Sequence, residues 1–114
     1  MNTEDLIATA QAMVAPGQGV LAADESTVTI TKRFEKIGIE STADTRRDYR
    51  ELLLTAPDMG KHISGVILYD ETIRQESSDG RPFPKMIAEQ GIIPGIKVDT
   101  GAKPLALAEG EKVT

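Results

Sequence analysis

Apolar residues recur at helical spacing near the start of the chain. A capping residue at Asn2 or Thr3 precedes Glu4 and Asp5, whose charges suit the positive end of a helix dipole. The apolar face that follows consists of Leu6, Ile7, Ala10, Met13 and Val14. The pattern predicts a first helix with one buried face, ended by the turn-forming segment 15–18.

Continuous apolar runs predict three strands. The first run covers Val20–Ala23 and the second covers Ser64–Tyr69, and acidic residues follow both. The third strand is expected at or after Pro94, over Gly95–Val98, because proline cannot donate to a strand ladder. Uniformly apolar strands separated by helices are typical of parallel pairing with right-handed crossovers.

Two helices are predicted between the first and second strands. Ser26 or Thr27 caps a second helix, which Gly38 ends. Thr42 caps a third helix, which Pro57 ends. The expected buried residues of these helices are Ile30, Phe34, Ile37, Tyr49, Leu52 and Leu53.

The remaining segments are polar or short. A turn at 79–80 precedes a short helix over Lys85–Gln90, with Pro84 in its first turn, and Asp99–Thr114 is expected to be irregular. Three strands do not close a barrel, and a small parallel sheet leaves two bare edges. The pattern therefore predicts either a small open α/β sheet or the beginning of a larger α/β domain.

Composition narrows the classes of function. The chain has 114 residues, a net charge of -5, no cysteine and a single histidine, His62, which is expected to be exposed. These counts exclude disulfides, thiolate metal sites and a Ser-His-Asp triad other than through His62, and the negative charge argues against a nucleic-acid partner. No apolar run reaches the ~20 residues that span a bilayer, and no signal peptide precedes the first helix. We expect a cytoplasmic protein with no membrane partner.

The junction after the first strand carries the strongest candidate chemistry. Asp24 and Glu25 arrive where the buried strand ends, and the hydroxyl of Ser26 follows at a helix start. Carboxylates at the carboxyl end of a strand often lie in the active sites of α/β enzymes. A charged turn between a strand and a helix has the same pattern, so both interpretations stay open.

Nine segments, in register along the chain, resemble one known family. They are Gly19–Thr27, Lys32–Phe34, Ile37–Gly38, Arg46–Arg50, Leu52–Ala56, Gly65–Leu68, Glu71–Thr72, Asp79–Phe83 and Gly95–Asp99. Together they closely resemble the N-terminal part of class I fructose-bisphosphate aldolase, from about Val14 to about Leu105. No single segment would be specific, but the series is.

The resemblance implies a fold and an activity. The family folds as a TIM (β/α)8 barrel, which typically needs about 250 residues. Residues 1–114 would then be the N-terminal part of a single barrel domain, comprising its first three β/α units. The family is a metal-independent lyase of glycolysis and gluconeogenesis, without a cofactor. It cleaves fructose 1,6-bisphosphate to dihydroxyacetone phosphate and glyceraldehyde 3-phosphate through a lysine imine (Schiff base).

The family's imine-forming lysine lies on a later strand, and no residue of this chain matches it. We therefore expect these 114 residues to be inactive alone. The resemblance also implies a sugar bisphosphate as substrate and a homo-oligomer, a tetramer, for the full-length enzyme. The alternative is a truncated non-catalytic relic that binds sugar phosphates or a partner.

Two matched residues carry the chemistry that the resemblance implies. Asp24 matches the catalytic aspartate that assists proton transfers beside the imine lysine, and Lys97 matches a lysine that helps to hold the C6 phosphate. Read without the family, the pattern favours a solvated lysine at a strand end for Lys97. If both matches hold, Asp24 and Lys97 point at the same ligand from neighbouring strands.

Further matches imply a phosphate-binding site. Ser26 and Thr29 match two hydroxyls of the C6-phosphate site, and Arg33 matches an arginine that contributes to phosphate binding. At about 100° per residue these three lie on one helical stripe near a positive helix end. Arg46 matches another substrate-associated arginine, although Arg46 and Arg47 could equally form a surface charge pair.

Val28 departs from the family, which usually carries glycine or another small residue at that position. If the position has helical dihedrals, valine costs well under about 1 kcal/mol. If it needs a positive φ or a close approach of phosphate, a β-branched side chain is strained there and blocks the ligand. The sequence leaves this alternative open.

Overall fold

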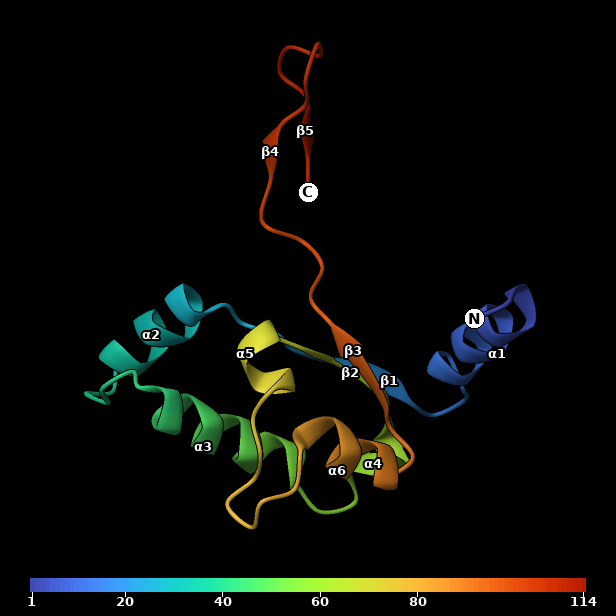
Figure 1. Cartoon of the computed structure of the whole chain (residues 1–114), viewed down its shortest axis with the longest axis vertical. Coiled ribbons are helices and arrows are strands. Elements are labelled where there is room, and N and C mark those ends of the chain that lie inside the picture. Colours follow the sequence, from blue (N-terminus) through green and yellow to red (C-terminus); the bar gives the residue numbers. More distant parts are fainter.

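A computed structural model describes residues 1–114 and alternates helices with strands (Figure 1). The elements are α1 (Thr3–Met13), β1 (Gly19–Ala23), α2 (Thr27–Glu35), α3 (Ala43–Leu54), α4 (Met59–His62), β2 (Ile63–Leu68), α5 (Asp70–Ile73), α6 (Phe83–Glu89), β3 (Ile93–Ile96), β4 (Lys103–Pro104) and β5 (Lys112–Val113). None of the helices has the length and hydrophobicity needed to cross a bilayer.

β1, β2 and β3 form one parallel sheet in that order, which confirms the predicted α/β class and pairing. Ala22 lies opposite Ile67, and Ile67 lies opposite Gly95. Side chains alternate between the two faces of a strand, so the residues two positions further on project from the same face. Asp24 and Lys97 therefore emerge on one side of the sheet at its carboxyl edge.

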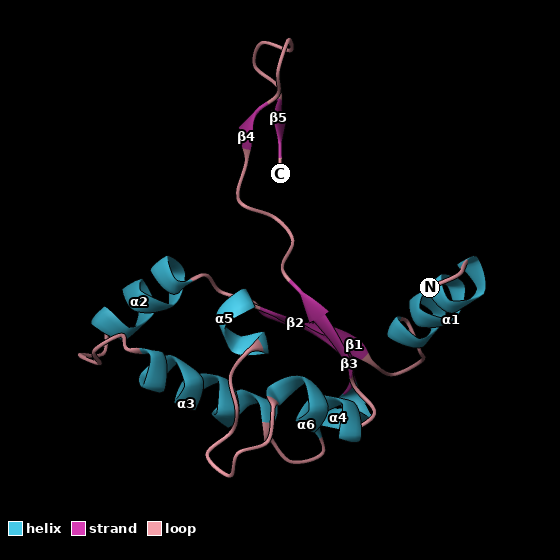
Figure 2. Cartoon of the chain, in the orientation of Figure 1, coloured by secondary structure: helices cyan, strands magenta, loops and turns pink.

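The opposite face of the sheet carries the hydrophobic core. Side chains from the strands pack there against α3, α4 and α6, which lie along one side of the sheet in Figure 2. The cluster consists of Ala23, Leu54, Met59, Val66, Leu68, Phe83, Met86, Ile87 and Ile92. All of them are buried, so the fold is held together mainly on this covered face.

α1 begins as predicted but does not bury its apolar side. The Asn2 side chain accepts the N–H of Asp5 at 2.9 Å, and the Asp5 carboxylate accepts the N–H of Asn2 at 3.1 Å, which completes a capping box. No residue of α1 is buried, so the predicted buried face is wrong. The reason is position: α1 touches the sheet only near its end, where Met13 packs on Gly65 of β2.

The third strand begins earlier than predicted. It starts at Ile93 and includes Pro94, which lies opposite Val66 of β2. Proline is tolerated because β3 is an edge strand with a neighbour on one side only. Beyond its formal end the Lys97 N–H donates to the Leu68 carbonyl at 2.9 Å, so the ladder extends to the candidate site residue.

Short elements depart from the expected loops. The structure adds the single helical turns α4 and α5, and His62 lies exposed at the end of α4, as expected for its exposure. The segment expected to be irregular contains the antiparallel pair β4–β5, which extends away from the rest of the chain in Figure 1. Periodicity does not detect elements of two to four residues.

α3 faces the core with a different stripe from the expected one. Leu52 is 72% exposed, and Ile37 after α2 is 68% exposed, so the predicted burial of both is wrong, whereas Arg50 and Leu54 are buried. Tyr49 is half-buried and meets Phe34 edge to face at 5.8 Å between ring centres. The inward side of α3 therefore carries Arg50 together with Leu54, while Leu53 packs against the core at its margin.

Val28 lies in the first turn of α2, in helical conformation, and its side chain is 66% exposed. It is not among the residues with positive φ. Of the two alternatives left open by the sequence, the unstrained one holds.

Candidate active site

The turn from β1 into α2 brings three predicted residues together. Asp24 continues the exposed face of β1, and Ser26 is the N-cap of α2. The Ser26 hydroxyl accepts the N–H of Thr29 at 3.3 Å, and the two hydroxyl oxygens lie 3.1 Å apart. A short polar junction of this kind ends a strand and begins a helix while leaving its side chains at the sheet edge.

Lys97 reaches this junction from the end of β3. Its Nζ lies 3.2 Å from Oδ2 of Asp24 and 2.6 Å from Oδ2 of Asp99. The side chains of Lys97 and Asp24 are 26% and 22% exposed. The expectation that the two residues lie on neighbouring strands is wrong, because β2 lies between β1 and β3. Their side chains nevertheless touch, although 73 positions separate them.

The charges around Lys97 reinforce its protonated form. The hydrogen bond to Asp99, followed by that to Asp24, raises the pKa of Lys97 above its ordinary value. The same ammonium, together with the N–H of Gly101 at 3.2 Å, lowers the pKa of Asp99. At neutral pH the site therefore contains an ammonium held between two carboxylates.

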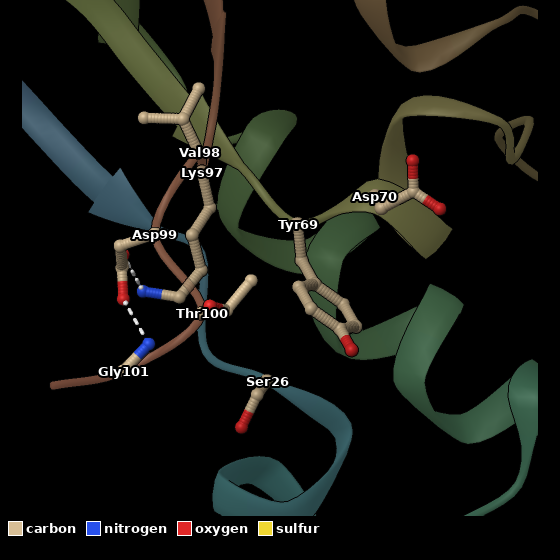
Figure 3. A pocket seen from close by; sticks show the side chains of 8 residues that line it. All are labelled: Ser26, Tyr69, Asp70, Lys97, Val98, Asp99, Thr100 and Gly101. Atoms are coloured by element: carbon tan, nitrogen blue, oxygen red, sulfur yellow. Dashed lines mark hydrogen bonds and ion pairs between the residues drawn. The ribbon is translucent and has the colours of Figure 1, made fainter. Parts of the chain in front are cut away.

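A hollow of about 540 Å³ opens beside Lys97 and Asp99 (Figure 3). Its lining residues are Ser26, Tyr69, Asp70, Lys97, Val98, Asp99, Thr100 and Gly101. In Figure 3 the side chain of Ser26 lies below Lys97 and that of Tyr69 lies to its right, whereas the carboxylate of Asp70 is turned away. The ammonium and hydroxyls can hold an anionic group, and a carboxylate beside them can exchange a proton with a bound ligand.

The two predicted arginines do not line this hollow. Arg33, 57% exposed, pairs with Glu25 at 2.5 Å. Arg46 grips Glu71 with two hydrogen bonds of 2.7 and 2.8 Å and donates to Ser41 at 3.0 Å. The hydrogen bonds from Arg46 lower the pKa of Glu71. Arg46 thus ties α3 to α5, and its side chain is 14% exposed, so it is not a solvated surface charge.

Sequence reasoning missed two lining residues with detectable signals. Asp99 follows Lys97 by two positions, which is the spacing of side chains on one face of a strand. Tyr69 is the last residue of the second apolar run, two positions after Ile67 and therefore on the same face of the strand. No group of three acidic or histidine side chains gathers in a way that could hold a metal ion.

Known proteins match the whole chain. The family described as fructose-bisphosphate aldolase class-I matches residues 5–114. A probable fructose-bisphosphate aldolase class 1 of Xanthomonas campestris pv. campestris is 63% identical over 100% of this chain and 34% of its own length. The cytosolic fructose-bisphosphate aldolase 7 of Arabidopsis thaliana is 52% identical over 97% of this chain and 31% of its own.

A solved structure gives the same result in three dimensions. The fructose-bisphosphate aldolase of Plasmodium falciparum, in complex with TRAP and a small-molecule inhibitor, superposes with a TM-score of 0.87. It is 47% identical in sequence, and the match covers 96% of this chain and 31% of that one. The chain thus spans about a third of the length of the relatives that it matches.

Proposed function

This chain belongs to the class I fructose-bisphosphate aldolase family, a family of lyases, and we propose that the protein containing it reversibly cleaves fructose 1,6-bisphosphate. The products are dihydroxyacetone phosphate and glyceraldehyde 3-phosphate. The observation that carries the proposal is the contact between Asp24 and Lys97 at the carboxyl edge of the sheet. A ligand held by the ammonium lies within reach of the carboxylate.

The proposed fold follows from the sheet. β1, β2 and β3 are the strands of the first three β/α units of a TIM (β/α)8 barrel. Residues 1–114 are the N-terminal part of this single barrel domain. The parallel order of the strands and the superposition on about a third of an aldolase support this assignment. In such barrels the active site lies at the carboxyl ends of the strands, where Asp24 and Lys97 meet.

Each predicted residue has a role in this scheme. Lys97 binds a substrate phosphate, and Asp24 assists the proton transfers that accompany cleavage of the carbon–carbon bond. Ser26 and Thr29, at the N-terminus of the nine-residue helix α2, contribute hydroxyls to the phosphate site. Arg33 and Arg46 are assigned to substrate binding by family resemblance, and each binds a carboxylate in this structure.

The imine is assigned to a lysine outside these 114 residues. The protein containing the chain acts in glycolysis and gluconeogenesis in the cytoplasm, as a homo-tetramer, without a metal or cofactor. The cytosolic name of the Arabidopsis relative supports the location. Val28 does not favour the alternative of a non-catalytic relic, because its helical conformation carries no strain.

A chimera tests the proposal directly. This chain replaces the matching third of the Xanthomonas campestris relative, which supplies the remaining strands; we call this protein the chimera. Cleavage of fructose 1,6-bisphosphate is measured in an assay that couples it to enzymatic reduction of the triose phosphates. We expect the chimera to turn over at a rate near that of the relative, and the 114-residue chain alone to show none.

The control and the contradicting results are defined in the same assay. The unaltered relative sets the reference rate. A chimera that folds, as judged by a cooperative thermal transition, but does not cleave the substrate would overturn the proposed function. Borohydride trapping with dihydroxyacetone phosphate should label a lysine outside residues 1–114, and an adduct on Lys97 would contradict its assignment to phosphate binding.

A further inference from the structure

Arg50 is a buried charge that the proposed chemistry does not use. It lies on α3, is 2% exposed, and is the largest of the fully buried side chains. Its Nη2 donates to the main-chain carbonyl of Glu25 at 2.8 Å, and its Nη1 lies 2.8 Å from Oε2 of the Glu25 carboxylate. Both contacts fall on the residue between Asp24 and Ser26.

The contacts between Arg50 and Glu25 are poorly suited to stabilising the fold. Arg50 Nη1 and Glu25 Oε2 are close but not aligned for a hydrogen bond, and Arg50 Nε has no acceptor. Burying two charges costs desolvation, and an imperfect pair recovers little of it. The aligned hydrogen bond is the one to the main chain, which fixes the position of the backbone at Glu25.

Glu25 connects the hydrophobic side of the sheet to the candidate site. Its carboxylate is directed to α3 and α2, where Arg50 and Arg33 bind it, whereas the side chain of Asp24 meets Lys97. The guanidinium of Arg50 also lies over the ring of Tyr49, 5.4 Å from its centre. The backbone of Glu25 is thus held by α3, while its neighbour Ser26 lines the hollow and its neighbour Asp24 contacts Lys97.

We propose that Arg50 and Glu25 form a positioning pair that holds the β1–α2 turn so that Asp24 and Ser26 reach the substrate. The inference rests on the proposed function, because it concerns the geometry of the same site. Arg50 touches no substrate in this scheme and acts only through the turn. A displacement of about 1 Å at a catalytic group can cost on the order of 10²-fold in rate.

Two variants of the chimera separate positioning from stability. Arg50→Met leaves the half-buried Glu25 with Arg33 as its one charged partner, so we expect a lower thermal midpoint and a lower kcat. The double variant Glu25→Leu/Arg50→Met removes both charges, and replacing a buried ion pair by apolar residues of similar volume is often neutral for stability. We expect its thermal midpoint to return close to that of the parent, while kcat at saturating fructose 1,6-bisphosphate stays reduced by on the order of 10²-fold.

Arg47→Met on the same helix is the matched control. Arg47 pairs only with its neighbours Asp48 and Asp44 at the surface, so this variant should keep both midpoint and kcat. A double variant that recovers stability together with full kcat would overturn the inference, because the pair would then be merely structural. A loss confined to KM would also contradict it, since misplacement of Asp24 acts on turnover.

If the double variant does not fold, the variant Arg50→Lys distinguishes a positioning role from a stabilising one. Lysine keeps the buried charge but cannot contact the carboxylate and the carbonyl with a planar fork, so a folded protein with reduced kcat is expected. Failure of both variants to fold would overturn the inference in favour of a stabilising role. An inactive parent chimera counts against the proposed function, whereas an active parent with fully active variants counts against the positioning pair alone.

Discussion

The two faces of the parallel sheet are built from the same apolar strands but differ in every other respect. One face is covered by α3, α4 and α6 and contains the whole buried cluster. The other leaves Val20 and Ala22 exposed and ends in the Asp24–Lys97 contact. Neighbouring residues show the contrast, since Ala23 is buried and Ala22 is exposed.

The difference shows how a strand serves stability and chemistry together. Alternation sends one set of side chains into the core, where their burial fixes the strand in place. The other set is then held rigidly and can carry charges at the strand end without disturbing the core. Glu25 and Arg50 link the two faces, because they tie the backbone of the site to a helix of the covered side.

The largest expected effect is on the covered face. Phe83→Ala in the chimera removes a fully buried ring, and we expect the free energy of unfolding to fall by about 3–5 kcal/mol. Leu52→Ala on exposed α3 surface should change it by less than about 0.5 kcal/mol. Urea unfolding measures both, and equal losses would show that the core is not where the structure places it.

A smaller effect separates two helix caps. Ser26→Ala and Asn2→Ala each remove a side-chain cap, worth about 1 kcal/mol of helix stability. Because Ser26 also lines the hollow, only its replacement should raise the KM for fructose 1,6-bisphosphate. Steady-state kinetics of the two chimera variants measures this, and an equal rise in KM for Asn2→Ala would remove the case for Ser26 as a ligand.

The smallest effect concerns Arg46 and Glu71. Because Arg46 lowers the pKa of folded Glu71 below its ordinary value of 4.5, the pair stabilises the protein above that pH. This contribution is lost as pH falls through the lowered pKa. We expect Arg46→Met to cost under about 1 kcal/mol at pH 7 and to weaken the acid-side loss of stability.

Urea unfolding of both proteins between neutral pH and the acid side of the transition tests this expectation. Arg47→Met serves as the surface control, since Glu71 contacts Arg46 and not Arg47. If parent and Arg46→Met lost stability in parallel as the pH falls, the pair would not be responsible. A large rise in KM for Arg46→Met would instead favour its assignment to substrate binding.

The sequence predicted the elements that burial or capping specifies. The three strands, the parallel order and the caps at Asn2, Ser26 and Thr42 agree with the structure. Uniform apolar runs and capping side chains act locally, so the strands and helix starts that they specify can be predicted without tertiary information. The contact between Asp24 and Lys97 was expected from the family resemblance and not from the apolar pattern.

Features that depend on tertiary packing could not be predicted. The inward rotation of α3 buries Arg50 and exposes Leu52, and hydrophobicity alone predicts the reverse. A signal was present, since Arg50 stands four positions before the buried Leu54, on its stripe. The apolar face of α1 is exposed for a related reason, because an apolar face is buried only where another surface packs against it.

The central claim is that Asp24 and Lys97 act on one bound sugar phosphate. A double-mutant cycle on kcat/KM in the chimera, with Asp24→Asn and Lys97→Met, measures it directly, and Asp44→Asn at an 86% exposed carboxylate is the control. Each single variant should lower kcat/KM by about 10²-fold, and the double variant should lose far less than the product. Strictly multiplicative losses, with no coupling between the two residues, would contradict the account.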